Sequence, residues 1–485
     1  MSLLDPAIWS GKAFIGGWTA VSGGTGSVVE PATGSVLERV GIASPDDVAV
    51  AAERAVEAQS AWARLPYTER AAVLRRAGDL FGRYAEEIQG WLIREAGSIP
   101  GKAAFETVTA AQECYEAAAL ASRPVGEVLP SAEPRLSLVR RVPAGVVGVI
   151  APFNVPLILG IRSVAPALAL GNAVILKPDV RTAVSGGVVI QRVFEEAGLP
   201  EGVLSMLPGG AEAGAALVVE PRVRVISFTG STAAGRKVGA AAAEHLKRAH
   251  LELGGNSALI VLPDADLDLA VSTAAWGSFF HQGQVCMTTG RHLVHRSVAE
   301  EYVARLAEKA EQLPVGDPAT EQVALGPIID AGQRDKIHGL VRASVDGGAR
   351  LVAGGTYEEL FYRPTVLADV TDSSPAYAEE VFGPVAPVRA FDDLDEAVAL
   401  ATASPYGLAL GILTADVMRG LELAERIPTG LVHVNDQTVN DEAVAPFGGF
   451  GASGTGVRFG GAANIEAFTE TRWITARGTQ ARYPF

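Results

Sequence analysis

The sequence contains few cysteines, since only Cys114 and Cys286 occur among its 485 residues. Two cysteines cannot form a disulfide framework, and this scarcity is typical of a protein from a reducing compartment. The chain also lacks runs of lysine or arginine, and its formal net charge is −15. A negative field of this kind repels nucleic acid and anionic membrane surfaces, so we expect neither as a partner.

No segment of the sequence is apolar for long enough to predict a membrane span. The most apolar stretch, residues 155–176, is interrupted by Arg162, Pro166, Gly171 and Asn172. The first residues contain no basic segment followed by an apolar run, so they do not resemble a signal peptide. We therefore expect a soluble, cytoplasmic protein.

The length of the chain exceeds what one hydrophobic core can organise, so two or three domains are expected. Hydrophobic residues make up 48% of it, and its 54 glycines follow no regular period, which indicates a globular protein with many tight turns. Residues 46–122 are rich in Ala, Glu, Arg and Leu, with apolar positions at roughly helical spacing. This segment is predicted to be helical.

From Val142 onward, short β-branched runs alternate with alanine-rich amphipathic stretches. Such alternation predicts a parallel sheet covered by helices on both faces, an architecture that binds nucleotides beyond the carboxyl ends of its strands. A second alternating series begins near Ser257 and predicts a second α/β domain. In the first series, the expected strands are residues 146–150, 173–176, 203–207, 223–228 and 250–253. In the second series, strands are expected over residues 258–262 and 292–295, and helices over residues 267–280 and 299–311.

Cys286 lies in the segment Gln-Gly-Gln-Val-Cys-Met-Thr, between an expected helix and an expected strand. Loops at such positions often carry chemistry. A lone cysteine is nevertheless more often a small buried hydrophobic residue than a nucleophile. The polar neighbours and nearby glycines weaken that interpretation without overturning it.

Two other polar residues, one at the end of an expected strand and one after another expected strand, allow two interpretations each. Glu252, between two leucines and before a glycine pair, is either a buried ion-pair partner or a general base whose pKa is raised by desolvation. Asn154, in Ala-Pro-Phe-Asn-Val-Pro, either caps the helix expected from Pro156 or donates its amide to an oxyanion. The residues alone leave both questions open.

A turn that suits a phosphate group occupies residues 228–235, Phe-Thr-Gly-Ser-Thr-Ala-Ala-Gly. It follows a strand and opens a helix, so its backbone N–H groups can face a pyrophosphate. The turn lacks the usual G-x-G-x-x-G pattern, and the Arg-Lys pair after it does not fit the phosphate loop of ATPases. Lys177, at the end of another strand, either reaches a ribose or phosphate or is a solvated charge.

Other chemistries have less support. His292 and His295 would point to opposite faces of a strand, so no metal is expected. The serine-hydrolase motif G-x-S-x-G is absent.

A cysteine hydrolase using Cys286 and His281 would leave the phosphate-type turn without a role. A non-catalytic binding protein on the same fold is the third hypothesis, and cofactor-dependent turnover separates the three.

Together these segments resemble the NAD(P)-dependent aldehyde dehydrogenase superfamily over essentially the whole chain. The spacing of Glu252 and Cys286 also resembles the family's spacing of base and nucleophile. The segments that carry the resemblance are residues 151–156, 177–178, 228–235, 252–255, 282–286, 379–384 (Glu-Glu-Val-Phe-Gly-Pro) and 446–449 (Pro-Phe-Gly-Gly).

The resemblance implies a role for each matching residue. Cys286 would be the nucleophile, Glu252 the general base and Asn154 the oxyanion donor. On the cofactor side, Lys177 would bind the adenosine ribose and Ser231 the pyrophosphate. The remaining expected cofactor-site residues are Glu380 and Phe382 at the nicotinamide ribose, Gly230 and Gly235 in the open turn, and Phe153 and Gly209.

The resemblance also implies a domain plan. A Rossmann-type NAD(P)-binding domain would comprise residues 1–122 and 142–253, and an α/β catalytic domain would comprise residues 254–450. Residues 123–141 and 451–485 would form a small oligomerisation arm. We expect a homodimer or homotetramer.

The residues that select the cofactor depart from the pattern of many relatives that prefer NAD. Those relatives carry a glutamate three residues after the lysine, where it binds the ribose 2′-hydroxyl and repels a 2′-phosphate. At that position this chain has Val180, which is followed by Arg181. Asp179 is a candidate to take over the ribose contact. NAD is therefore the favoured cofactor and NADP the alternative.

The implied reaction is oxidation of an aldehyde to a carboxylic acid through a cysteine thiohemiacetal and thioester. Glu252 favours hydrolysis of the thioester over transfer to coenzyme A. Residues 434–449 resemble the benzaldehyde dehydrogenase branch, close to vanillin and salicylaldehyde dehydrogenases, and Phe153, Val285 and Met287 would give an apolar lining. An aromatic aldehyde is expected. An aliphatic aldehyde or a semialdehyde is the alternative, although no basic anchor for a second carboxylate is evident.

Overall fold

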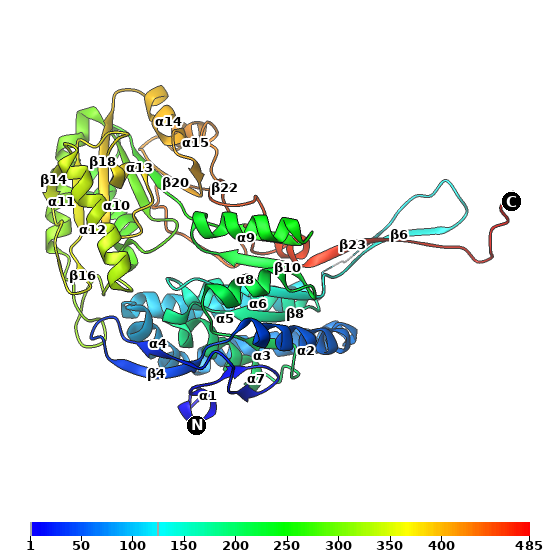
Figure 1. The fold of residues 1–485 in the computed structure, drawn as a ribbon. Helices are drawn as coiled ribbons and strands as arrows, with labels where there is room; N and C mark the ends of the chain where they lie inside the picture. The colour runs from blue at the N-terminus through cyan, green and yellow to red at the C-terminus, as the bar shows by residue number, and fades with distance from the viewer. Residues whose placement is uncertain (1, 124–125) are drawn as a thin grey trace.

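The computed structural model describes residues 2–123 and 126–485. The chain forms two α/β bodies, each built on a seven-stranded sheet, and a narrow arm that projects from them (Figure 1). Residues 124 and 125, within the segment expected to begin the arm, lie outside the described residues, as does residue 1. The predicted α/β class with parallel sheets is confirmed.

The helical segment predicted for residues 46–122 consists of four successive helices. Ser44 begins the first of them through a capping box with Asp47, in which each side chain accepts a hydrogen bond from the other residue's backbone N–H. Gly97 ends the third helix in the left-handed conformation that glycine adopts without strain, at φ 64°. The helices are α2 (Pro45–Arg64), α3 (Tyr67–Arg83), α4 (Ala85–Ala96) and α5 (Pro100–Leu120).

The first sheet contains all five strands predicted from the first series, as parallel neighbours in the order β11-β10-β7-β8-β9. Two short antiparallel strands extend it beyond β9. Every residue of β7 and β8 is buried, as expected for strands with helices on both faces. The elements are β7 (Val146–Ile150), β8 (Ala173–Lys177), β9 (Leu204–Met206), β10 (Val223–Thr229), β11 (Arg248–Glu252), α6 (Pro156–Ala169), α7 (Val189–Glu196), α8 (Ala211–Val219) and α9 (Thr232–Glu244).

The second sheet has the order β14-β17-β18-β13-β12-β20-β21 and is parallel except at β14. The sequence predicted its strands β12 and β13 and the helices α10 and α11. The elements are β12 (Ser257–Val261), β13 (Thr289–His295), β14 (Arg350–Ala353), β17 (Thr365–Ala368), β18 (Val385–Phe391), β20 (Ala409–Leu413), β21 (Leu431–Val434), α10 (Leu267–Phe279), α11 (Arg296–Gln312), α12 (Ala331–Asp346), α14 (Leu394–Thr402) and α15 (Val417–Ala424).

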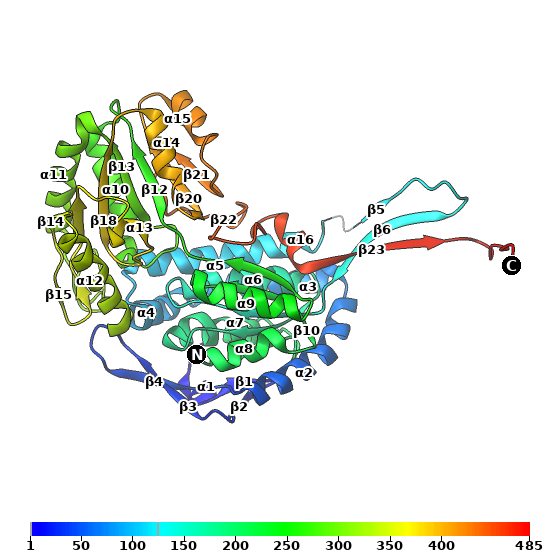
Figure 2. The same cartoon turned by 45° about the horizontal axis from the view of Figure 1, so that its top comes forward.

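The arm is an antiparallel sheet of three strands, β5 (Gly126–Val128), β6 (Leu136–Pro143) and β23 (Thr469–Ala476). It extends away from both bodies and ends near the C-terminus (Figure 2). Two apolar side chains on it are largely exposed, Val128 at 76% and Trp473 at 62%. The arm therefore presents apolar surface that nothing within this chain covers, among the residues described.

Shorter elements complete the fold. None of the helices in the described part of the chain is long and apolar enough to cross a membrane. The short elements are α1 (Pro6–Trp9), β1 (Ala13–Phe14), β2 (Trp18–Thr19), β3 (Thr25–Val29), β4 (Val36–Gly41), η1 (Val180–Thr182), η2 (Val184–Val188), η3 (Phe280–Gly283), β15 (Tyr357–Glu358), β16 (Phe361–Tyr362), α13 (Pro375–Ala378), β19 (Tyr406–Gly407), β22 (Phe450–Gly451) and α16 (Ala463–Phe468).

Candidate active site

A cavity of about 880 Å³ lies between the carboxyl ends of the first sheet's strands and residues of the second body. Two of the predicted site residues, Glu252 and Gly235, are not part of its wall. The other nine line it together, from both bodies of the protein: Phe153, Asn154, Lys177, Gly209, Gly230, Ser231, Cys286, Glu380 and Phe382.

Cys286 stands on a loop whose backbone is held in an unusual conformation. Three successive residues before it have positive φ angles: His281 (50°), Gln282 (56°) and Gly283 (64°). Only tertiary contacts can maintain such a turn. The Gln282 amide donates to the carbonyl oxygens of Gly97 at 3.0 Å and Pro327 at 2.9 Å, which anchors the loop to the end of α4 in the first body and to the segment before α12 in the second.

The thiol of Cys286 is partly exposed to the cavity but electrostatically disfavoured as a thiolate. Burial raises its pKa to about 12, and the neighbouring carboxyl groups of Glu380 and Glu252 add to this shift. In the absence of a cofactor, the thiol is therefore protonated at neutral pH.

Glu252 is the last residue of β11, and its side chain is 4% exposed. Its Oε2 atom has no hydrogen-bond partner among the described residues. Burial raises its pKa well above the ordinary value, while Arg162 and Arg458 oppose that shift. Gly448 makes room for it, because a Cβ atom there would lie 2.9 Å from Oε1. A buried carboxyl of this kind suits a general base.

Asn154 does not cap the following helix, so that interpretation of the sequence is wrong. The N-cap position of α6 is Val155, and no side chain caps it. The Asn154 amide instead donates to the carbonyl oxygen of Gln284 at 2.8 Å, two residues before Cys286. One amide hydrogen remains for another acceptor in the cavity.

A buried ion pair on α5, which was not predicted from the sequence, holds the Asn154 loop. Lys102 pairs with Glu106 and donates to the backbone oxygen of Asn154 at 2.8 Å. Glu106 accepts from the backbone N–H of Leu157 at 3.1 Å. The sequence does contain a signal for this ion pair, a row of polar residues on one helical face at spacings of four, three and four: Lys102, Glu106, Thr109 and Glu113. All four are buried in the structure.

The cavity also carries groups suited to a dinucleotide. Lys177 is 9% exposed and donates to the oxygen of Pro178 at 3.1 Å, which leaves further ammonium hydrogens for a ligand. Ser231 is the N-cap of α9, where backbone N–H groups favour an anion. These donors fit a ribose and a pyrophosphate.

The two glycines of this turn serve close packing. A Cβ atom on Gly230 would lie 2.7 Å from the ring of Phe228, and one on Gly235 would clash with Leu253. Gly235 therefore allows α9 to approach the strand end, rather than facing the cavity.

Glu380 and Phe382 enter the cavity from the second body. Glu380 Oε1 accepts from the backbone N–H of Gly255 at 2.9 Å. Phe382 has a positive φ of 56°, which is rare for a bulky residue, and its ring meets that of Phe153 edge-on at 5.8 Å. Such strained positions cluster at functional sites.

The residues that follow Lys177 form an ion-paired group at the cavity wall. Arg181 donates to both carboxylate oxygens of Asp179 at 2.9 Å and to Asp330 at 2.8 Å, and it lies 4.1 Å above the Phe153 ring. Val180 also lines the cavity. Both oxygens of Asp179, the expected substitute for the missing glutamate, are thus already engaged by Arg181.

The geometry gives no support to the alternative chemistries. His281 is fully buried, its pKa is far below the ordinary value because of burial, and neither ring nitrogen has a hydrogen-bond partner within the described chain. It therefore makes no hydrogen bond to Cys286. His292 is buried between Ser278 and Tyr302 and bonds to both at 2.8 Å. No cluster of metal ligands occurs in residues 2–123 and 126–485.

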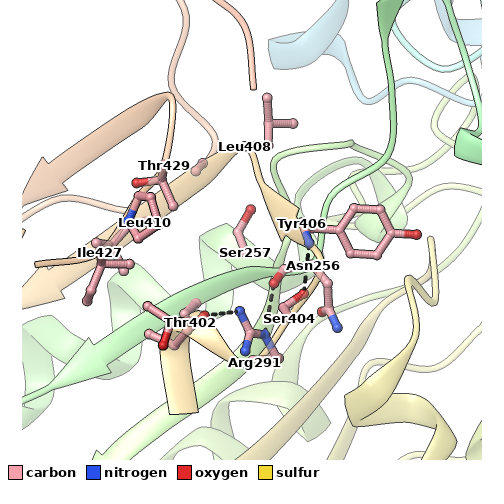
Figure 3. A pocket seen from close by; sticks show the side chains of 14 residues that line it. Asn256, Ser257, Arg291, Thr402, Ser404, Tyr406, Leu408, Leu410, Ile427 and Thr429 are labelled. Carbon is pink, nitrogen blue, oxygen red and sulfur yellow. Dashed lines mark hydrogen bonds between the residues drawn. The ribbon is translucent and has the colours of Figure 1, made fainter. Parts of the chain in front are cut away.

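A second, smaller cavity of about 40 Å³ lies in the other body (Figure 3). Arg291 fills its wall and donates to the carbonyl oxygens of Asn256 at 2.9 Å, Leu400 at 2.8 Å and Ala401 at 3.0 Å. The Arg291 guanidinium is therefore already hydrogen-bonded to backbone carbonyl groups. We assign this cavity a structural role.

Comparison with known proteins identifies the family of this chain. Residues 18–474 match the model of the aldehyde dehydrogenase family. Vanillin dehydrogenase from Amycolatopsis sp. is 72% identical, with 100% of both chains covered, and the NAD(+) benzaldehyde dehydrogenase of Pseudomonas putida is 51% identical, with 99% of both covered. The crystal structure of a salicylaldehyde dehydrogenase from Pseudomonas putida G7 complexed with salicylaldehyde superposes with a TM-score of 0.94 at 37% identity, covering 98% of this chain and 99% of that one. The expected resemblance, including its benzaldehyde dehydrogenase-like branch, is confirmed, and the chain belongs to the aldehyde dehydrogenase family.

Proposed function

We propose that this protein oxidises an aromatic aldehyde to the carboxylic acid with NAD. The observation that carries the proposal is that Cys286 and Asn154 share a single cavity with Lys177 and Ser231, while Glu252 is buried beside it. The relatives at high identity are named for vanillin and benzaldehyde. Apolar residues pack around Cys286, including Val285, Met287 and Phe447, as an aromatic ring requires.

The residues of the cavity fit NAD. Lys177 would hold the adenosine ribose, Ser231 the pyrophosphate, and Glu380 with Phe382 the nicotinamide ribose. When bound, the nicotinamide supplies a hydride acceptor. NAD is favoured by the relative named for it, and NADP is the alternative because Val180 offers no carboxylate against a 2′-phosphate.

The chain's own residues perform the covalent chemistry. The Cys286 thiol gives its proton to a water molecule in the cavity, and Sγ attacks the carbonyl carbon of the aldehyde. The oxyanion of the resulting thiohemiacetal accepts hydrogen bonds from the Asn154 amide and the Cys286 backbone N–H. After loss of the hydride a thioester remains. Glu252 takes a proton from water, the water oxygen bonds to the acyl carbon, the C–S bond breaks and the sulfur is released for another turnover.

The domain plan and assembly follow from the same family. Residues 1–122 and 142–253 would form the cofactor domain, residues 254–450 the catalytic domain, and residues 123–141 and 451–485 the arm. The exposed apolar side chains of the arm support a homodimer or homotetramer, which light scattering can measure. The two free cysteines agree with a cytoplasmic location.

The test is to follow the absorbance of reduced nicotinamide while the protein acts on benzaldehyde with NAD or, separately, NADP. Growth of the band with formation of benzoate is expected, and added coenzyme A should neither accelerate it nor enter the product. Activity only with aliphatic aldehydes or semialdehydes would keep the enzyme class and overturn the aromatic substrate. No activity with any aldehyde would overturn the proposal.

A further inference from the structure

An ion pair joins the two bodies of the protein at the wall of the large cavity. Arg181 belongs to the first body, in the short helix η1 that follows β8, and it lines the cavity. Asp330 belongs to the second body, where it is the N-cap residue of α12. Arg181 Nη1 donates to Asp330 Oδ2 at 2.8 Å, and the two side chains are 38% and 40% exposed. The pair therefore lies where the wall of the cavity meets solvent.

This ion pair is part of a closed circuit of five residues that crosses between the bodies twice. The Arg181 guanidinium lies 4.1 Å from the centre of the Phe153 ring, and Phe153 meets Phe382 of the second body edge-on at 5.8 Å. Within the second body, Asp330 Oδ1 accepts from the backbone N–H of Gln333 at 2.8 Å. The Gln333 amide donates to the carbonyl oxygen of Phe382 at 2.9 Å, which completes the circuit. The ion pair thus helps to hold Phe382 against Phe153.

The circuit faces the space in which the dinucleotide is expected. All of its residues except Asp330 line the cavity. Glu380, expected at the nicotinamide ribose, depends on the same helix, because Lys336 of α12 donates to its backbone oxygen at 3.0 Å. The first turns of α12 therefore position both Phe382 and Glu380. A movement of α12 away from the first body would widen the cavity at this edge and withdraw both residues.

Both partners keep other contacts when the ion pair opens. Arg181 donates from Nε and Nη2 to the two carboxylate oxygens of Asp179, each at 2.9 Å, so its guanidinium stays oriented from the first body. Asp330 continues to cap α12 through its other oxygen. Ion pairs exposed to this degree are weak and are screened by salt. The contact can therefore open and close while both bodies stay folded.

We propose that the Arg181–Asp330 ion pair is a latch between the two bodies that slows the release of the bound dinucleotide. When the latch is closed, α12 keeps Gln333 and Phe382 at the cavity wall. When it opens, the second body moves away from the first at this edge and the dinucleotide leaves. This inference rests on the proposed binding of NAD and adds the step that controls its release.

The test measures the release of NADH by stopped-flow fluorescence, with excess NAD added so that released NADH does not rebind. Asp330→Asn is the main variant, because asparagine caps helices as well as aspartate does but carries no charge. At low salt the variant should release NADH about two to five times faster than the wild type, the range expected for an exposed ion pair. The difference should disappear at about 1 M salt, where the screening length is about 3 Å.

Two further variants show whether the ion pair itself is responsible. Asp335→Asn is the matched control, because Asp335 lies on the same helix and pairs with its neighbour Arg334 at 2.7 Å. It should release NADH at the wild-type rate. Arg181→Met removes the other partner, and Asp330→Asn should have no further effect when it is added to Arg181→Met. This double-mutant cycle separates the ion pair from any change that Arg181→Met makes to the cavity wall.

The outcomes separate the latch from the proposed function. Equal release rates for the wild type and Asp330→Asn at low salt would overturn the latch. An undiminished effect of Asp330→Asn in the Arg181→Met background would also overturn it, because the effect would then come from the start of α12. Failure of the wild-type protein to bind NADH or NAD would instead contradict the proposed function. Asp330→Ser, which also keeps a capping side chain without charge, replaces Asp330→Asn if that variant does not fold.

Discussion

Lys102 donates a hydrogen bond from Nζ to the backbone carbonyl oxygen of Asn154 at 2.8 Å, although the two residues belong to different elements. The ammonium is fully buried and also pairs with Glu106, which accepts a hydrogen bond from the backbone at the start of α6. Together they fix the segment that carries the oxyanion donor. Lys102 is thus a positioning residue for Asn154.

Replacing Lys102 with methionine should lower kcat by about tenfold to a hundredfold, because a displaced oxyanion donor stabilises the transition state less well. The KM for NAD should change less than kcat, since Lys177 ends β8 and Ser231 begins α9, away from the Lys102 contact. Lys12→Met is the control, as Lys12 donates to the carbonyl oxygen of Ile8 at 3.0 Å, far along the chain from the site. An unchanged kcat in Lys102→Met would contradict the positioning role.

The Cys286 thiol should react slowly with iodoacetamide at neutral pH in the cofactor-free enzyme. Its pKa is raised to about 12, so the thiolate fraction should keep growing with pH beyond the point where an ordinary thiol, with a pKa of about 8.5, levels off. Peptide mass spectrometry of a Cys114→Ala background measures this rate. If the labelling rate levelled off near the ordinary thiol pKa, the Cys286 thiol would not be desolvated. The rate at which Cys114 is labelled in the Cys286→Ala variant provides the background.

Introducing glutamate at Val180 should increase the preference for NAD over NADP about tenfold or more. The new carboxylate would accept from a ribose 2′-hydroxyl and repel a 2′-phosphate. Val180→Gln has nearly the same shape without the charge, so it separates repulsion from packing. Ratios of kcat/KM for the two cofactors are the measurement, and equal ratios in the wild type and in Val180→Glu would contradict the placement of Val180 at the ribose.

The buried His250 should make the fold sensitive to acid. It lies between the rings of Phe459 and Phe468, and burial lowers its pKa to about 3, with Arg248 adding to the shift. Between about pH 6.5 and 3, His250 is protonated in the unfolded chain but not in the folded chain. The free energy of unfolding therefore falls as the pH falls. At pH 5 it should be about 2 kcal/mol lower than at neutral pH because of this one group.

Between pH 7 and pH 5, the Tm of the His250→Leu variant should therefore decrease less than the Tm of the wild type. The exposed His245 offers a control, because His245→Leu should leave the pH dependence unchanged. Parallel Tm curves for the wild type and His250→Leu would be inconsistent with a neutral His250 in the folded protein.

The sequence revealed the strands that are buried on both faces and the residues that belong to local motifs. Strands β7 and β8 are continuous apolar runs, so their bounds were predicted to within one residue. Strand β18 was missed because Pro387 interrupts its apolar run and Arg389 follows. The Lys102–Asn154 bond and the pairing of Arg162 with Asp441 could not be predicted, since each joins residues brought together only by the packing of α5, α6 and a distant loop.

The most direct test of the catalytic account is the intact mass of Glu252→Gln after it is mixed with benzaldehyde and NAD. Without its general base the enzyme should form the thioester but hydrolyse it slowly, so a benzoyl group should accumulate on Cys286 with a burst of about one equivalent of reduced cofactor. Peptide mapping locates the adduct, and Cys286→Ala should give neither the adduct nor the burst. Rapid continuous turnover by Glu252→Gln without an adduct, or a benzoyl group on another residue, would contradict the account.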